Sequence, residues 1–209
     1  MDADDISYKT RFAKQIAILE KEDADICGCH WHSVNHLRKL IEPKLVPLEQ
    51  DSILLTMTYT VPFAHGSVMI RRNFLTSHEL KYTSQHQCED YDLWSKMFFK
   101  NAKIVNLNEF LYERRVVGGS LTATNNKKLA VSERLVRKQF IKYFYIDLAK
   151  LTKSLCLDIS SLTEIERVYL LLLSKKIFPF WSKSFINIIR KSSMKTIGLF
   201  VLYRIKEIA

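Results

Sequence analysis

Three carboxylates lie at the start of the chain, in the run Met1-Asp2-Ala3-Asp4-Asp5. Alternate carboxylates that leave the end of a strand offer hard oxygen ligands to a divalent cation, which can at the same time bridge two phosphate groups. The same residues would also suit the first turn of a helix, because the helix dipole favours acidic side chains there. The residues alone leave both interpretations open.

A second acidic group, Glu89-Asp90, has Asp92 close behind it. A carboxylate on a turn beside another carboxylate can act as general base on a hydroxyl group. The alternative is helix capping, with Asp90 or Asp92 as the N-cap residue. Read in isolation, this motif favours capping.

The segment Cys27-Gly28-Cys29-His30-Trp31-His32 gathers side chains that bind zinc in other proteins. Alternation along a strand, however, would send Cys27 and Cys29 to one face and His30 and His32 to the other. The one-residue spacing also differs from a CxxC knuckle. We therefore expect a half-buried strand over residues 24–34.

The elements that must position these residues alternate between helix and strand. Phe12, Ile16 and Leu19 recur at helical spacing, which predicts an amphipathic helix from Tyr8 to about Lys21, with Ser7 as its N-cap. Further along we expect loops with one short strand at 53–55, a turn into a strand over 65–72, a helix from 88 to about 100, and strands at 103–107 and 109–117.

From residue 125 onward the pattern becomes helical. The predicted apolar stripe of the first of these helices consists of Leu129, Leu135, Val136, Phe140, Phe144 and Leu148, with Lys and Arg on the other face.

The composition is that of an ordinary globular protein. The chain has 209 residues, of which 47% are hydrophobic and 26% charged, so it can bury a core without metal or disulfide staples. Its five glycines form no Gly-rich phosphate-binding loop, and its four cysteines point to a reducing compartment rather than a disulfide framework. No run of 18 apolar residues exists, so the sequence predicts no simple membrane-spanning helix.

The net charge of +10 is concentrated near the C-terminus. Residues 1–65 sum to −3, residues 66–123 to +2 and residues 124–209 to +11. Within that last part, Lys and Arg interleave with aromatic residues over 161–209, a pattern typical of helices that lie on anionic lipid. A solvated helical cap is the alternative. Nucleic acid is a third possibility, but no recognised nucleic-acid motif is present and we expect no such partner.

The order of the motifs is more specific than any one of them. Five runs follow one another, namely Asp2-Ala3-Asp4-Asp5-Ile6-Ser7, Arg11-Phe12-Ala13-Lys14-Gln15, His65-Gly66-Ser67-Val68-Met69-Ile70-Arg71-Arg72, Glu89-Asp90-Tyr91-Asp92-Leu93-Trp94 and Arg115-Val116-Val117-Gly118-Gly119-Ser120. This succession resembles the family 2 glycosyltransferases of bacterial surface-polysaccharide assembly, which have the GT-A fold. The resemblance covers residues 1 to about 122.

The resemblance implies a role for each matching residue. Asp2 and Asp4 correspond to the DxD pair that binds Mg2+ or Mn2+ and, through it, the donor diphosphate, with Asp5 beside them. Asp90 corresponds to the base that takes the proton of the acceptor hydroxyl in inverting members, with Glu89 as its partner. The residues expected on the acceptor side are His65, Arg71, Arg72, Trp94 and Arg115.

Two departures from the family pattern stand out. Members commonly have a histidine that completes the metal shell where this chain has Val117, so the Mg2+ or Mn2+ site lacks that ligand. In addition, the family's DxD motif follows a nucleotide-binding half of about 90 residues, at roughly 30 per βαβ unit. We therefore expect a truncated chain, with Met1 an internal methionine of a longer frame.

The sequence thus predicts an α/β protein: a partial GT-A, Rossmann-like glycosyltransferase domain over 1–122, followed by a basic, α-helical C-terminal extension over 123–209. The predicted function is inverting, metal-assisted transfer of a sugar from a nucleotide-sugar donor to a polysaccharide or lipid-linked acceptor, as in capsule or lipopolysaccharide assembly. The alternative is a non-catalytic remnant or accessory protein docked on the membrane. The predicted location is cytoplasmic, at the inner face of the plasma membrane, held there by residues 161–209.

Overall fold

The structure is a computed structural model that describes residues 2–83, 87–116 and 126–157, together with nine isolated positions further on. Those positions are 162, 167, 169, 170, 172, 173, 189, 192 and 193. Val117 and almost all of the tail 161–209 lie outside the described residues, so the predictions made for them stay predictions.

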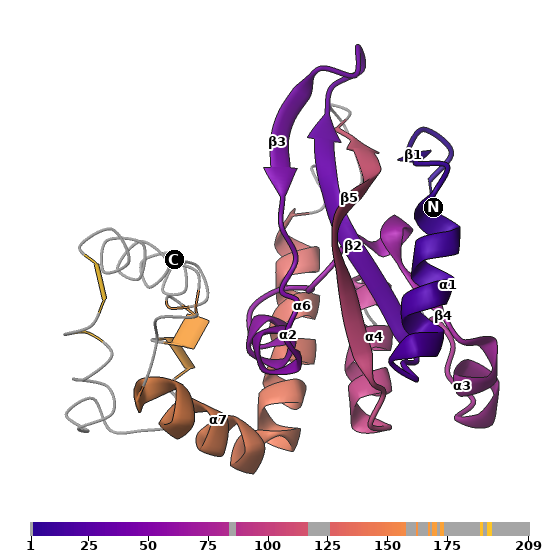
Figure 1. The fold of residues 1–209 in the computed structure, drawn as a ribbon. Coiled ribbons are helices and arrows are strands. Elements are labelled where there is room, and N and C mark those ends of the chain that lie inside the picture. The colour runs from indigo at the N-terminus through magenta and orange to yellow at the C-terminus, as the bar shows by residue number, and fades with distance from the viewer. Residues whose placement is uncertain are drawn as a thin grey trace.

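A mixed five-stranded sheet forms the centre of the molecule (Figure 1). Its main order is β1-β5-β2-β3, and β4 pairs with β2 beside this path. The long strands β2 and β5 run parallel, with Ile26 opposite Ile104, while every other pair is antiparallel. The strands are β1 (Ile6–Ser7), β2 (Ile26–Val34), β3 (Leu40–Lys44), β4 (Met69–Ile70) and β5 (Ile104–Arg115).

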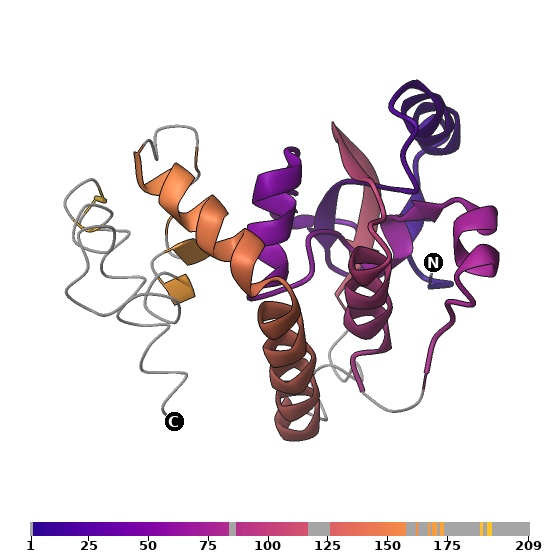
Figure 2. The same ribbon diagram turned by 90° about the horizontal axis from the view of Figure 1, so that it is seen from below.

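Helices cover both faces of this sheet (Figures 1 and 2). On one face, Leu19 of α1 packs with Ala24 and Cys27. On the other face, α2, α4 and α6 share one core with Ile26 of β2 and Ile104 of β5. The helices are α1 (Arg11–Lys21), α2 (Gln50–Met57), α3 (Arg72–Ser77), α4 (Glu89–Phe99), α6 (Asn126–Tyr143) and α7 (Tyr145–Leu157), and the 3-10 turn η1 covers His65–Ser67.

The strand expected at 24–34 is confirmed as β2, but it is buried on both sides. Ile26 and Cys27 are each fully buried and belong to cores on opposite faces of the sheet. A strand between two helical layers cannot keep one wet face, which explains why apolar residues do not simply alternate with polar ones here. The sheet flanked by helices confirms the α/β class and is compatible with a partial Rossmann-like glycosyltransferase domain.

The short strand expected at 53–55 is wrong, because these residues lie in helix α2. A brief apolar run fits a buried strand or a buried helix equally well, and only its neighbours in the fold decide. Ile53 and Met57, one turn apart, both enter the core beneath the sheet. The strand in this region is β3 instead, whose edge position tolerates Pro43.

Helix α1 is present, but its predicted start is wrong and, of its predicted apolar stripe, only Leu19 is buried. Ser7 lies in β1 and the N-cap residue is Thr10. Phe12 and Ile16 are 55% and 48% exposed, whereas the residues turned inward are Arg11, Gln15 and Leu19. The helix therefore buries polar side chains against the sheet, and their hydrogen bonds replace the expected apolar contact.

Three further differences concern strand β5 and helices α3 and α6. The two strands expected at 103–107 and 109–117 are one strand, β5, with irregular pairing to β2 near Cys29 and His30. Helix α3 was not predicted. In α6 the expected stripe holds at Val136 and Phe140, but Leu135 is exposed.

Strand β5 pairs with β2 along its whole length and with β1 only at Tyr112 and Glu113. From Ile104 to Phe110, its other edge has no strand partner within the described residues. Among the residues that the structure describes, no helix is long and apolar enough to span a membrane.

Gly28 sits where two side chains press against the backbone of β2. Its N–H donates to Asn106 Oδ1 at 3.0 Å, and Asn106 Nδ2 donates in turn to the carbonyl of Pro47 at 2.7 Å. A Cβ placed on Gly28 would lie 2.4 Å from that Asn106 oxygen and 2.9 Å from Cβ of Phe63. The absent side chain is thus what lets the β2–β5 pair accept Asn106.

Replacing this glycine should destabilise the protein. We expect Gly28→Ala to lower the free energy of unfolding by about 2 kcal/mol or more, because the core must shift to admit the methyl group. Urea denaturation measures the loss. In a double-mutant cycle with Asn106→Ala, the double variant should lose less stability than the two single variants lose together, because the clash with the Asn106 side chain is then absent. An unfolding midpoint unchanged by Gly28→Ala would contradict this packing.

Candidate functional site

The acidic pair at 89–90 opens helix α4. Cys88 is its N-cap residue, so Glu89 and Asp90 are the first two helical residues and neither Asp90 nor Asp92 caps the helix. Glu89 is exposed and Asp90 is half-buried. One oxygen of Asp90 accepts the N–H of Tyr91 at 2.7 Å. Because Asp90 is only half-buried, its carboxylate at the helix N-terminus still faces partly towards solvent.

Asp92, by contrast, is buried and structural. Its Oδ2 accepts hydrogen bonds from Thr83 Oγ1, at 2.9 Å, and from Lys96 Nζ one turn along α4. The bond to Thr83 ties the preceding loop to the helix. Because Tyr82 is the neighbouring residue, this contact also places the Tyr82 ring beside the acidic pair.

His65 and Tyr82 meet next to α4. Nε2 of His65 lies 2.8 Å from the Tyr82 hydroxyl, and the two rings are 5.5 Å apart edge to face. Beneath them, the fully buried Trp94 packs edge to face with His65, at 6.1 Å, and with Phe63. The predicted residues His65, Glu89, Asp90 and Trp94 therefore surround one place in the fold.

The carboxylates here raise the pKa of neighbouring side chains. Partial burial, then Asp90 and Glu89, raise the pKa of Tyr82, so its hydroxyl keeps its proton at neutral pH. Burial raises the pKa of Cys88 to about 12, with Glu133 and Asp90 adding to the effect. Glu133 of α6 is thus a further carboxylate at the N-terminus of α4.

The second group of predicted residues lies where β1 meets β5. The Asp5 carboxylate accepts the Tyr112 hydroxyl and the backbone N–H of Arg115, the latter at 2.9 Å. Burial, then Asp5, raise the pKa of Tyr112, and the charge of Asp2 acts in the same direction. Nε of Arg115 is buried with no hydrogen-bond partner in the described part of the chain.

Asp2 and Asp4 are both exposed, unlike Asp5, whose two oxygens are already engaged. Their carboxylates are oxygen donors of the hard kind, and Mg2+ is commonly held by one or two protein carboxylates together with water and substrate phosphates. The residues present thus fit such an ion. Among residues 2–83, 87–116 and 126–157, no group of three His, Cys, Asp or Glu side chains could enclose a metal by itself.

Two polar residues on the buried face of α1 connect the two groups. Arg11 donates from Nη1 to the carbonyl of Gly66 at 2.8 Å, and its guanidinium lies over the Tyr112 ring at 5.2 Å. Nε2 of Gln15 donates to Ser67 O at 2.8 Å and to Cys27 O at 2.9 Å. The turn η1, which carries His65, is therefore fixed to the same helix that follows the acidic loop.

The remaining predicted residues lie apart from these contacts. Arg71 donates from Nε to the carbonyl of Ala24, at 2.7 Å, and from Nη2 to that of Leu19, at 2.9 Å, so it joins the end of α1 to β2. Arg72 is exposed at the first residue of α3. Neither contacts His65 or the acidic pair through any hydrogen bond that the described residues form.

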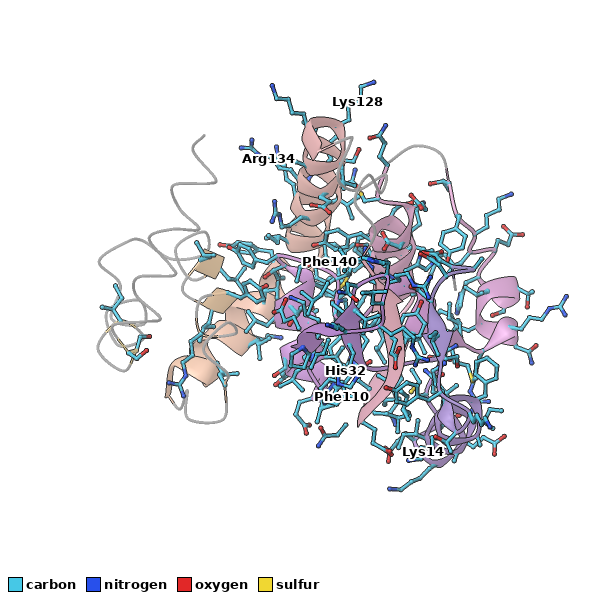
Figure 3. All side chains as sticks on the ribbon, turned by 90° about the horizontal axis from the view of Figure 1, so that it is seen from above. Lys14, His32, Phe110, Lys128, Arg134 and Phe140 are labelled. Carbon is cyan, nitrogen blue, oxygen red and sulfur yellow. The ribbon has the colours of Figure 1, made fainter. Side chains whose placement is uncertain are left out.

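The histidines of β2 have partners within the sheet. His30 is buried, with Nε2 2.8 Å from Asn108 Oδ1 and Nδ1 accepting the N–H of Val46 at 3.1 Å. His32 stacks on Phe110 at 4.3 Å, and the two lie side by side in Figure 3. These contacts describe a strand and its packing, in line with the strand interpretation of this segment.

Sequence reasoning missed Tyr82, Glu133 and Tyr112 as members of these groups. Tyr82 stands in a stretch without periodicity, and Glu133 lies on a helix that follows the recognisable motifs. Arg11 and Gln15 did carry a signal, because two polar residues four apart on one face of α1 would have to be either solvated or hydrogen-bonded in the core.

No protein-family model matches the chain. Among curated proteins, it is similar to the "Putative glycosyltransferase EpsE" of Bacillus subtilis (strain 168), with 29% identity over 119 residues. The matched stretch is 54% of this chain and 41% of the relative, so the chain spans about two fifths of the length of the protein it matches. This similarity supports a relationship to glycosyltransferases.

The polar face of α1 yields a direct test. We expect Gln15→Leu to lower the free energy of unfolding by about 3 kcal/mol, because two buried carbonyls lose a donor. The same replacement at the exposed Gln139 of α6 is the matched control and should change stability by less than about 0.5 kcal/mol. Urea denaturation measures both. Equal effects at the two positions would contradict a structural role for Gln15.

Proposed function

We propose that this chain carries the acceptor side and the diphosphate-binding loop of an inverting glycosyltransferase of the GT-A type. It would transfer a sugar from a nucleotide-sugar donor to a polysaccharide or lipid-linked acceptor. The observation that carries the proposal is the connection between two groups of side chains. One group is Asp5 with Tyr112, and the other is His65 with Tyr82, beside Asp90. Buried Arg11 joins the two groups, because it contacts both the Tyr112 ring and the carbonyl of Gly66.

Asp90 has the surroundings that a general base for an alcohol requires. It is half-buried, it opens a helix, and it faces partly towards solvent, where an acceptor hydroxyl can reach it. In the proposed reaction the acceptor oxygen attacks the anomeric carbon, its proton passes to Asp90, and the bond from that carbon to the diphosphate breaks. Tyr82 and His65 supply hydrogen-bonding groups that would orient the acceptor.

The exposed loop at the start of the chain would receive the donor diphosphate. Asp2 and Asp4 are the residues proposed to hold Mg2+ or Mn2+, and Arg115 would contribute a positive charge beside them. When bound, such an ion stabilises the charge that develops on the departing nucleoside diphosphate. Asp5 holds the loop against Tyr112 and Arg115 and is proposed as a positioning residue.

A non-catalytic accessory role is the second candidate. The unpaired edge of β5 between Ile104 and Phe110 favours it, because no strand among the described residues pairs there to cradle a nucleotide. We propose that transfer needs a nucleotide-binding half on that edge. We further propose, as in the sequence prediction, that the tail 161–209 holds the protein at the inner face of the plasma membrane.

Asp90→Asn tests the enzymatic proposal. The chain, with and without any coding sequence found upstream of Met1, is incubated with Mn2+ and a panel of UDP- and GDP-sugars, and release of nucleoside diphosphate is measured. We expect turnover in the extended form only, and a fall in kcat of about 100-fold or more for Asp90→Asn with folding unchanged.

The control for that variant is Asp51→Asn. Asp51 is the second residue of α2, as Asp90 is of α4, and it is exposed, so both changes remove one carboxylate from the same helical position. Asp51→Asn should leave kcat within about twofold. Turnover in neither form of the wild type would refute the enzyme and favour the accessory protein, and equal activity of the Asp90 and Asp51 variants would remove Asp90 from the reaction.

A further inference from the structure

Helix α6 presents a long basic face to solvent. Its 18 residues would extend about 27 Å at 1.5 Å per residue. Val136 and Phe140 turn one side into the core beneath the sheet. At about 100° per residue, the side opposite to these two collects eight exposed residues within an arc of about 140°, namely Lys127, Lys128, Val131, Arg134, Leu135, Lys138, Gln139 and Lys142. We call this the α6 face.

The charge of the α6 face is one-sided. Five of its eight residues are cations and none is acidic. Within the described part of the chain, none of these five cations forms an ion pair with a carboxylate. The single acid of the helix, Glu133, lies away from this face, where Asp90 contributes to raising its pKa and it contributes in turn to raising the pKa of Cys88. Figure 3 shows Lys128 and Arg134 projecting from the part of α6 that extends beyond the core, whereas Phe140 lies within it.

Apolar side chains lie in the middle of this basic surface. Val131 and Leu135 are 60% and 48% exposed, one turn apart, and flanked by the cations. Lys and Arg can extend their charged ends around an apolar strip of this kind, which is the arrangement of helices that lie in a lipid headgroup region.

Another exposed apolar surface, around the β2–β3 hairpin, differs in charge. There Lys44 pairs with Glu42 at 2.7 Å and Arg38 pairs with Glu113 at 3.0 Å, so most cations are already neutralised. Nucleic acid is disfavoured at the α6 face because single strands are bound by aromatic stacking, and the face has no aromatic residue.

We propose that the α6 face binds the surface of an anionic lipid bilayer. Val131 and Leu135 enter the headgroup region, and the five cations contact lipid phosphates. The face adjoins the candidate site, since the N–H of Gln87, just before α4, donates to Ser132 Oγ of α6 at 3.3 Å. If the proposed function holds, bilayer binding through α6 brings Asp90 to the membrane surface, where a lipid-linked acceptor would present its hydroxyl.

The test is co-sedimentation of the full chain with vesicles, in the absence of donor. We expect binding to vesicles of phosphatidylcholine with 30% phosphatidylglycerol, little binding to pure phosphatidylcholine, and a steep fall between 50 and 300 mM salt. The double variant Arg134→Glu/Lys138→Glu should reduce the partition coefficient roughly tenfold or more. Val131→Ser/Leu135→Ser should reduce it severalfold without changing the net charge.

Lys9→Glu/Lys39→Glu is the matched control, because it changes the net charge equally at exposed positions outside α6. It should bind within about twofold of the wild type. Lys127→Glu/Lys128→Glu provides a second reversal, in the first turn of α6, where acidic residues suit the helix dipole and folding is retained.

Four results would overturn the proposal: no binding by the wild type, equal binding to neutral vesicles, equal loss in the α6 and control variants, or tighter binding to a single-stranded oligonucleotide that displaces the vesicles. Retained binding in both α6 reversals would also overturn it, and would leave the tail 161–209, proposed above, as the membrane contact. Failure of the proposed transferase activity would leave these binding results unchanged, so the two proposals fail separately.

Discussion

The buried guanidinium of Arg11 is the contact on which the arrangement of the candidate site depends. It is 2% exposed, donates to the Gly66 carbonyl and lies against Tyr112, whose hydroxyl in turn holds Asp5. Burial lowers the pKa of Arg11, because the charged guanidinium loses solvation in the core. A charge placed in the core needs fixed partners, so the acidic loop, α1 and the turn at His65 are constrained together.

The same constraint explains the unusual helix α1. A helix that packs on a sheet ordinarily turns a leucine or isoleucine stripe inward, yet here Arg11 and Gln15 are inside and Phe12 and Ile16 are outside. Arg11 and Gln15 donate hydrogen bonds to backbone carbonyls of β2 and η1. These directional bonds fix the orientation of the helix on the sheet as well as stabilising the contact. A purely apolar interface would not specify the position of His65 in this way.

Patterns in the sequence were sufficient to predict the α/β class, the strand at β2 and the helix after Cys88. Of the residues expected on the acceptor side, His65 and Trp94 contact each other, whereas Arg71 and Arg72 lie apart. Sequence reasoning could not predict that α2 is helical at 53–55, because a short apolar run has no period of its own. It also missed Tyr82 and Glu133, which reach the site through the Asp92–Thr83 bond and the packing of α6 on α4. Contacts between segments distant in sequence determine both.

In the proposed enzyme, the loop at Asp2–Asp5 and the residues around Asp90 form one donor–acceptor site. The most direct measurement is a crystal of the chain, with any coding sequence found upstream of Met1, soaked with Mn2+ and a nucleoside diphosphate and recorded at the manganese absorption edge. We expect an anomalous peak within coordination distance of Asp2 and Asp4, with the phosphates beside Arg115 and open space leading to Asp90. Manganese and diphosphate bound elsewhere, or a loop occupied by neither, would contradict it.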